Sequence, residues 1–298
     1  MSSVASTAPL LVELFTEELP PKALERLSRA FAEVFEATLA AEGLIAQGST
    51  TDRFATPRRL ACRVNRVHAQ GPERAIREKL MPVTVARGPD GAPTAALRKK
   101  LAASGRAALA EVDFGTSVGH ERLVIEADGK ADYVWCVGTA SGKTIEEVAP
   151  RALEAAIAKL PIPKVMTYQL ETDCELPGWS SVNFVRPAHG LVALHGSTVV
   201  PVKALGLTAG NSTQGHRFEA AVSPVGLANA DSYADTLRKD GAVIASFAER
   251  KAEIARQLAA AAAKVGNGAR PIEDEALLDE VTALVERPNV VTCSFETE

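Results

Sequence analysis

Charge is distributed unevenly along the 298-residue chain. Residues 53–110 hold 13 basic and 3 acidic groups, whereas residues 1–52 hold 3 and 8, and residues 271–298 hold 1 and 8. The overall net charge of −4 therefore conceals a segment of +10 between two acidic ends. A fold of this sequence must either present the basic segment to a polyanion or neutralise it with its own carboxylates. The sequence leaves both alternatives open.

The composition is typical of a folded, water-soluble protein. Hydrophobic residues make up 46% of the chain and charged residues 23%, and the mean hydropathy is +0.02. No window approaches the ~18 consecutive apolar residues of a membrane span, and the first residues lack the layout of a signal peptide. The four cysteines form no CxxC pair. We therefore expect a cytoplasmic protein with reduced thiols and no membrane contact.

Strand-like and helix-like patterns follow one another without a regular β-α-β alternation. Apolar runs and alternating residues predict strands at 10–16, 60–64, 122–127, 133–138, 190–195, 198–204 and 289–295. Helical spacing and N-cap signals predict helices after Pro20, Thr144 and Ser246 and near 273–285. One short basic helix is expected near 94–104, within an otherwise loop-like stretch at 80–119. The pattern predicts an α+β fold with mixed and antiparallel sheets and packed helices.

The length is enough for about two domains. We expect a first α+β lobe over residues 1–175, which contains the basic segment 53–110, and a second lobe over residues 176–298. One continuous domain is the alternative. The last residues follow a strand-like run without a terminal signal, so we expect the second lobe to be incomplete at its C-terminus.

Residues 138–144, Gly-Thr-Ala-Ser-Gly-Lys-Thr, follow a strand, open a helix and end like a phosphate-binding P-loop. A P-loop needs four residues between its glycines to wrap a phosphate with backbone N–H groups, and this stretch has three. A glycine turn followed by a helix cap is therefore the favoured interpretation. The histidines show no metal-ligand spacing and no nucleophile motif occurs. We expect neither a metal site nor a catalytic residue in this chain.

Several basic residues follow or precede a proline or glycine, which puts a planar, bidentate donor on rigid or tightly turned backbone. Such donors suit phosphate or carboxylate ligands. For each site taken alone, an internal ion pair that holds a loop in place is the favoured interpretation. Two further signals come from the strand at 60–64, whose alternation predicts a basic outer face that includes Arg59 and Arg63. The candidates are Arg58, Arg59, Arg63, Arg186, His216 and Arg217.

Six segments, taken together, resemble the β subunit of bacterial glycyl-tRNA synthetase, and they occur in the same order over almost the whole chain. They are LLVELFTEELPPKAL at 10–24, ATPRRLACRV at 55–64, KLPIPKVM at 159–166, FVRPAHGLVALHG at 184–196, GHRF at 215–218 and EVTALVERPNVV at 280–291. The segment at 184–196 also resembles the editing module in the large subunit of phenylalanyl-tRNA synthetase. That second resemblance implies a related α+β fold for residues 176–298, and we infer no editing activity from it.

The first resemblance implies an α2β2 ligase whose α subunit carries the class II aminoacylation site and binds ATP and magnesium. The β subunit would support binding of tRNA(Gly), and a second β subunit would be reached only through the α2β2 assembly. The family's β chain is longer, so this chain would be its N-terminal part. Glu249-Arg250 lies in a helical pattern without preceding glycines, unlike a class II motif, and no class I HIGH-type box occurs. We therefore expect this chain alone to bind no cofactor and to be non-catalytic.

Three hypotheses remain for the basic residues. In the first, the six candidates and the basic segment 53–110 contact tRNA phosphates. In the second, the chain is an assembly module that docks on the α subunit without direct RNA contact. In the third and most remote, residues 138–144 form a nucleotide hydrolase site.

Overall fold

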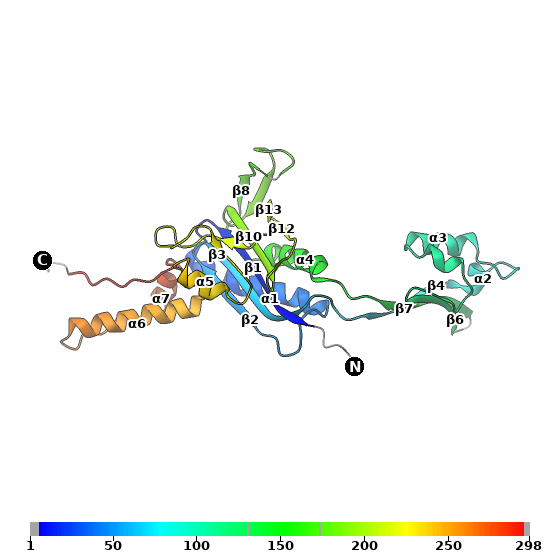
Figure 1. Ribbon diagram of the computed structural model, residues 1–298, viewed down its shortest axis with the longest axis horizontal. Helices are drawn as coiled ribbons and strands as arrows, with labels where there is room; N and C mark the ends of the chain where they lie inside the picture. The colour runs from blue at the N-terminus through cyan, green and yellow to red at the C-terminus, as the bar shows by residue number, and fades with distance from the viewer. Residues whose placement is uncertain (1–5, 130, 173, 295–298) are drawn as a thin grey trace. The chain divides into compact units, whose positions relative to one another are not determined.

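The structure is a computed structural model that describes residues 6–129, 131–172 and 174–294 (Figure 1). The chain forms two compact units: unit 1 contains residues up to 70 and from 144 onward, and unit 2 contains residues 71–143. This division differs from the expected lobes at 1–175 and 176–298. The reason is that the first strand of the chain pairs with a strand near residue 190, so the two ends of the chain share one core.

Unit 1 is built on a five-stranded antiparallel sheet. β1 lies at its centre and pairs with β10 on one side and β3 on the other. The order across the sheet is β11 (Thr198–Val199), β10 (Ala188–His195), β1 (Thr7–Thr16), β3 (Arg59–His68) and β2 (Thr51–Thr56). Because β1 and β10 are far apart in sequence, this pairing brings the chain's distant segments together.

Two helices cover one face of this sheet (Figure 1). α1 (Leu24–Ala41) follows the short 3-10 helix η1 (Pro21–Ala23) and buries residues at three- and four-residue spacing, as the sequence predicts. α4 (Ile145–Ala158) packs against α1 and begins with a capping box formed by Thr144 and Glu147. The even-numbered apolar residues of β1 point into this core.

A second layer covers the opposite face. Leu11, Ala61 and Val192 pack there against α5 (Tyr233–Lys239) and the coil that follows it. The expectation of a basic outer face on β3 is therefore wrong, since Arg59 is fully buried on this side. Residue alternation correctly separates the two faces of β3 but does not reveal that a second layer covers the basic one.

The rest of unit 1 consists of two C-terminal helices and several short hairpins. α6 (Phe247–Val265) starts at Ser246, whose hydroxyl accepts from the Glu249 N–H, and α7 (Glu275–Thr282) follows it. The strand predicted at 289–295 is wrong for residues 289–294, which form no strand, and residue 295 lies outside the described residues. The hairpins are β8 (Met166–Gln169) with β9 (Ser181–Phe184), β12 (Lys203–Ala204) with β13 (Leu207–Thr208), and β14 (Ser212–Thr213) with β15 (Val225–Gly226).

Unit 2 contains a four-stranded antiparallel sheet with helices on one face. Its order is β4 (Arg74–Pro82), β7 (Ala131–Ala140), β6 (Glu121–Asp128) and β5 (Ser117–Val118). The covering elements are α2 (Val83–Ala86), α3 (Ala95–Ala103) and the 3-10 helix η2 (Ala107–Ala110). The expected β6–β7 hairpin and the short basic helix are confirmed, although Lys130 of the predicted turn lies outside the described residues.

Much of the stretch predicted as a loop at 80–119 is folded. Leu97 and Leu101 of α3 are completely buried and pack with Leu109 beneath the sheet. The helix predicted near 94–104 is confirmed, whereas the expected loop is wrong for residues 80–86 and 107–110, which form the end of β4, α2 and η2. The alanine-rich composition of the stretch obscures the period of the few leucines that form the core.

The P-loop-like motif continues a strand instead of forming a phosphate loop. β7 runs on through Gly138 to Ala140, and Thr144 is the N-cap of α4. A Cβ at Gly138 would lie 2.1 Å from the carbonyl oxygen of His120, so glycine is needed there for close strand packing. This geometry supports the turn-and-cap interpretation of the motif.

The described residues contain neither a candidate membrane span nor a candidate metal site. None of their helices is both long and apolar enough to cross a membrane. They also contain no group of three or more His, Cys, Asp or Glu side chains arranged to hold a metal ion.

We predict that Gly138→Ala destabilises unit 2 by about 1–3 kcal/mol, because the new methyl group meets backbone that cannot rotate away. Thermal unfolding followed by Trp135 fluorescence in a Trp179→Phe background measures this, since Trp135 lies on the same strand. Gly226→Ala is the matched control, because a Cβ at Gly226 has no neighbour within 4 Å. Unfolding of Gly138→Ala at the wild-type temperature would contradict the packing argument.

Candidate functional site

Backbone hydrogen bonds bring three distant segments together at one end of the three inner strands of the sheet. The N–H of Thr16 donates to the carbonyl of Arg58 at 2.8 Å, and the N–H of Leu19 donates to that of Pro57 at 2.6 Å. The N–H of Glu17 donates to the carbonyl of Pro187 at 2.9 Å. The residues after β1, before β3 and before β10 therefore meet at one place.

A cleft of about 300 Å³ opens at this meeting point. Three of the sequence-predicted residues, Arg58, His216 and Arg217, line it together. The segment 284–287, which follows α7, forms its other wall. The remaining lining residues are Glu18, Pro57 and Phe218.

Arg58 connects the two walls of the cleft. Its Nη2 donates to Glu286 Oε2 at 2.9 Å and to the carbonyl of Gly215 at 3.0 Å. Both charged side chains are almost completely buried. A Cβ at Gly215 would lie 2.6 Å from the carbonyl oxygen of Gly241, so only glycine lets the backbone pass this close. Arg58 therefore orders the cleft, and its guanidinium is already occupied.

Arg59 lies beneath the cleft, within the second core layer. Its Nη2 donates to the Gln214 carbonyl at 2.5 Å, and its Nε lies 3.6 Å from Glu13 Oε2. Glu13 in turn accepts hydrogen bonds from the hydroxyls of Thr213 and Tyr233. Burial alone would lower the pKa of Arg59, but Glu13 and Glu286 hold that pKa above its ordinary value. Arg59 is therefore a buried cation that no large ligand can reach.

Arg250 is the third buried arginine of this cluster. It donates to the carbonyls of Ile244 and Ala55, each at 2.7 Å, and to that of Thr282 at 3.0 Å. Burial lowers the pKa of Arg250 to about 10, although Glu286 opposes the shift. The side chain stays charged at neutral pH and ties α6 to β2 and to the end of α7.

Glu286 is the carboxylate that Arg58 and Arg59 share. Its Oε2 accepts from Arg58, and its Oε1 accepts from the Thr56 hydroxyl at 3.0 Å and lies 3.8 Å from Arg59 Nη1. Burial by itself would raise the pKa of Glu286. The charges of Arg59 and Arg58 and the two hydrogen bonds outweigh burial, so the pKa is lowered overall.

Two arginines at the rim keep their guanidinium groups in solvent. The side chain of Arg217 is 55% exposed and that of Arg287 is 54% exposed. Each has one exposed acidic neighbour, Glu17 at 3.9 Å and Glu219 at 3.0 Å. Phe218 is 87% exposed and packs edge-on against His216, whose Nδ1 accepts from the Phe218 and Glu219 N–H groups. The rim therefore offers two accessible cations beside an aromatic ring.

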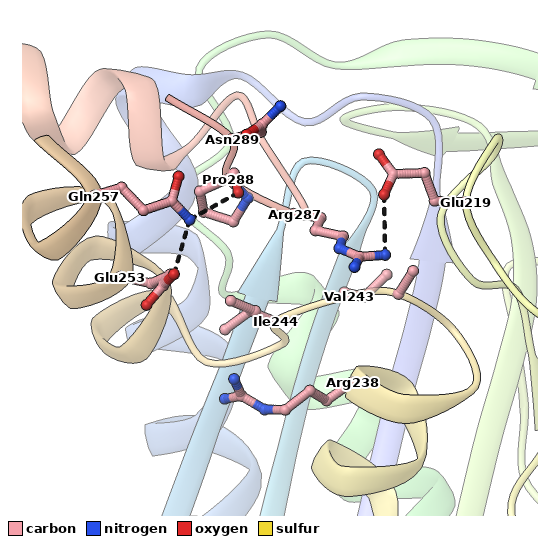
Figure 2. Close-up of a pocket in the computed structure, with 10 residues that line it drawn as sticks. Glu219, Arg238, Val243, Ile244, Glu253, Gln257, Arg287, Pro288 and Asn289 are labelled. Atoms are coloured by element: carbon pink, nitrogen blue, oxygen red, sulfur yellow. Dashed lines mark hydrogen bonds and ion pairs between the residues drawn. The ribbon is translucent and has the colours of Figure 1, made fainter. Parts of the chain in front are cut away.

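Arg287 also lines a second, adjoining pocket of about 480 Å³ (Figure 2). Figure 2 shows Arg287 turned toward Glu219, while Gln257 of α6 joins Glu253 to the Pro288 carbonyl. Arg256 and Gln257 lower the pKa of Glu253 to about 2, so this carboxylate is ionised at neutral pH. The polar groups of this pocket mostly satisfy one another.

The other two sequence-predicted residues lie outside the cleft. Arg186 donates to the carbonyls of Glu18 and Val185 at 2.8 and 2.9 Å, so it supports the rim residue Glu18 without lining the cleft itself. Arg63 donates to Asp52 at 2.7 Å and lines a separate pocket with several carboxylates.

Residues 10–298 match the family described as glycyl-tRNA synthetase beta subunit. The chain belongs to this family. It is 61% identical over 294 residues to the glycine–tRNA ligase beta subunit of Polaromonas naphthalenivorans, covering 98% of this chain and 40% of that protein. Over 290 residues it is 57% identical to the corresponding subunit of Paracidovorax citrulli, covering 97% of this chain and 40% of the relative. The chain thus spans about 40% of the length of these relatives.

Four of the six segments on which the glycyl-tRNA synthetase resemblance rests line the cleft, and a fifth, 184–196, is hydrogen-bonded to Glu17 beside it. They contribute Glu18, Arg58, the Pro187 carbonyl, the 216–218 turn and Glu286. Sequence reasoning missed Glu13, Arg250, Glu286 and Arg287. Glu13 and Arg287 carry readable signals, because Glu13 interrupts an apolar strand and Arg287 precedes a proline as Arg186 does, whereas nothing distinguishes Glu286 within its acidic segment.

The acidic ends of this family member neutralise part of its basic segment. Glu13 and Glu286 belong to the two ends, and they surround Arg59. In unit 2, Arg106 pairs with Glu78 at 2.6 Å and with Glu121 at 3.0 Å. The charge pattern leaves two alternatives open, a surface that faces a polyanion and neutralisation by the chain's own carboxylates. These contacts are of the second kind.

We predict that Glu286→Gln destabilises unit 1 by about 3 kcal/mol at pH 7, because it leaves the charges of Arg58 and Arg59 without their shared carboxylate. The pKa of Glu286 in the folded state is below the ordinary 4.5. The stability that its ionised carboxylate gives to the folded state is therefore present above about pH 4.5, and it is lost as the pH falls through the pKa of the folded state. Urea unfolding at several pH values measures the difference, which should shrink between pH 5 and pH 3. A difference that stays constant over this range would contradict the assignment. Arg287→Ala, next in the chain and exposed, is the control.

Proposed function

We propose that this chain is the N-terminal part of the β subunit of a cytoplasmic glycine–tRNA ligase, and that it helps to bind and position tRNA(Gly). Glycylation itself would occur on the α subunit of an α2β2 heterotetramer, where ATP and magnesium bind. The observation that carries the proposal is the cleft rim, where Arg217 and Arg287 remain accessible beside the exposed ring of Phe218. Accessible arginines and aromatic rings are the groups that bind nucleic-acid backbones and bases.

The proposed mechanism is positional. The α subunit forms glycyl-adenylate from glycine and ATP, and the 3′ end of the tRNA attacks that adenylate. Binding energy that the β subunit collects from the tRNA holds this end near the adenylate and lowers the entropic cost of the second step. The buried cluster of Arg58, Arg59 and Glu286 keeps the rim residues in place for that contact.

Two observations support a non-catalytic role for this chain. Glu249-Arg250 lies on α6, and the Arg250 guanidinium is fully buried with backbone carbonyls as its partners. It therefore cannot hold ATP as a class II arginine does.

We also propose that residues 176–298 share part of their α+β fold with the editing module of phenylalanyl-tRNA synthetase, without any editing activity.

We predict that Arg217→Ala with Arg287→Ala in the complete enzyme weakens tRNA(Gly) binding and lowers the slope of log affinity against log salt by about one per lost phosphate contact. Filter binding or anisotropy at several salt concentrations measures both quantities. Arg29→Ala is the matched control, because Arg29 is equally exposed and also paired with a glutamate, but lies on α1. An unchanged salt slope in the double variant would sink the rim assignment.

The alternative proposal is an assembly module that docks on the α subunit without RNA contact. One observation favours it. In the loop between β8 and β9, Trp179 is 84% exposed and Leu176 is 60% exposed. Glu171 and Glu175 lie in the same loop. Exposed apolar side chains with acidic neighbours suit a protein surface better than a phosphate backbone.

If assembly is the function, Trp179→Ser with Leu176→Ser should reduce capture of the α subunit at least tenfold while leaving tRNA affinity unchanged. Co-purification with a tagged α subunit measures the first effect, and a tRNA titration measures the second. Val291→Ser, at a third exposed apolar residue, is the control for general loss of apolar surface. Unchanged capture by the double variant would exclude this loop as the docking site.

A further inference from the structure

Among the described residues of unit 2, the helices cover only one face of the four-stranded sheet. On β7, Val134 and Cys136 are buried against the helices, whereas the alternating residues Tyr133 and Trp135 are only partly buried. Their cross-strand neighbours on this face include Lys79 on β4 and Val124 on β6, and neither is buried. The two aromatic rings therefore lie on the central strand of an open sheet face.

Cations lie over both rings. The Arg77 guanidinium carbon is 5.0 Å from the centre of the Trp135 ring, and Lys79 Nζ is 3.5 Å from the centre of the Tyr133 ring. Tyr133 and Trp135 are two residues apart on one strand, so their side chains leave the same face from Cα atoms about 7 Å apart. The Trp135 indole N–H is shielded from solvent and has no hydrogen-bond partner among the described residues. Buried indole N–H groups usually have an acceptor.

The charged partners that the structure gives these two cations are exposed carboxylates. Arg77 pairs with Glu126 and Lys79 with Asp128, and all four side chains are at least one-third exposed. Exposed ion pairs contribute little to stability, so phosphate oxygens can take the place of these carboxylates. Arg122 adds a third exposed cation to the same face, which gives three cations against two carboxylates.

We propose that this aromatic sheet face, formed by Arg77, Lys79, Arg122, Tyr133 and Trp135, binds a single-stranded segment of RNA. Two neighbouring unpaired bases stack on Tyr133 and Trp135, and Arg77 and Lys79 hold the phosphates beside them. Aromatic residues on an open four-stranded sheet bind unpaired bases by this means in other folds. The inference rests on the proposed tRNA-supporting function and assigns part of it to unit 2.

The composition of the face favours RNA over a protein partner. Its aliphatic residues on β6 and β7, Val124 and Val137, offer little area for the apolar centre that a protein interface needs. Stacking needs aromatic rings with nearby cations, and the face offers two partly exposed rings that a base can reach when Arg77 and Lys79 move from them to the phosphates. A protein that binds there is the competing outcome of the test.

The two tryptophans of the chain, Trp135 and Trp179, make a direct test possible. In Trp179→Phe, Trp135 becomes the sole fluorescent indole. Titration of this variant with an unstructured 12-nucleotide oligoadenylate RNA at low salt should quench its emission to saturation. In Trp135→Phe, the emission of the remaining Trp179 should not change on addition of the same RNA.

Affinity is measured separately, by anisotropy of the same RNA with a fluorescent label. Trp135→Ala and Tyr133→Ala should each weaken binding by about 5- to 150-fold, whereas Trp135→Phe should keep most of it because a ring remains. Arg77→Ala should lower the salt slope by about 0.7. Ile125→Ala, an exposed apolar residue on the opposite face of the same sheet, is the matched control and should bind as the wild type does.

Three results would overturn the proposal: RNA binding without quenching of Trp135, wild-type affinity in Trp135→Ala, or quenching by the purified α subunit but not by RNA. Failure of the aromatic sheet face can be distinguished from failure of the proposed tRNA-supporting function. If Arg217→Ala with Arg287→Ala weakens tRNA binding in the complete enzyme while Trp135 does not respond to RNA, the aromatic sheet face is wrong and the tRNA-supporting function stands.

Discussion

Burial of three arginines beside two glutamates is the constraint on which the arrangement of unit 1 depends. Arg58, Arg59 and Arg250 carry one more charge than Glu13 and Glu286 can neutralise. A buried guanidinium is stable only when its N–H groups find acceptors. Backbone carbonyls of residues 55, 214, 215, 244 and 282 supply most of these acceptors. Nε and Nη1 of Arg59 have no hydrogen-bond partner among the described residues and are stabilised by the charges of Glu13 and Glu286 alone. The arginines therefore determine where three separate loops must pass, and the cleft is the space that those loops leave open.

Local patterns predicted the elements of the fold well because they depend on neighbouring residues. The buried positions of α1 and the capping box of α4 are examples. The division into units was not predictable, because it depends on the pairing of β1 with β10, which no local signal encodes. The strand predicted at 289–295 failed for a related reason. The Val290 N–H donates to the side chain of Gln257 on α6, so the segment is held by a side chain where a strand neighbour was expected.

The candidate site also shows that local sequence patterns do not reveal long-range contacts. Arginine beside proline or glycine correctly marked residues with special backbone roles, and three of the six candidates share one cleft. The pattern could not tell a buried structural arginine from an accessible one, since Arg58 and Arg59 have the same local sequence signal as Arg217. What separates them is the second layer over the sheet. A carboxylate from the acidic C-terminal segment, Glu286, reaches the first two and leaves the third at the rim.

The contacts proposed for the two units differ in what they can recognise. Stacking on Tyr133 and Trp135 would accept any unpaired base, because every base offers a similar face. Phosphate contacts at Arg217 and Arg287 would also be independent of sequence. Neither unit would then select tRNA(Gly) by base identity, and both would supply affinity and orientation. Under the proposed function, selection would come from other parts of the ligase. Contacts of this kind would raise the rate for whichever tRNA those parts select.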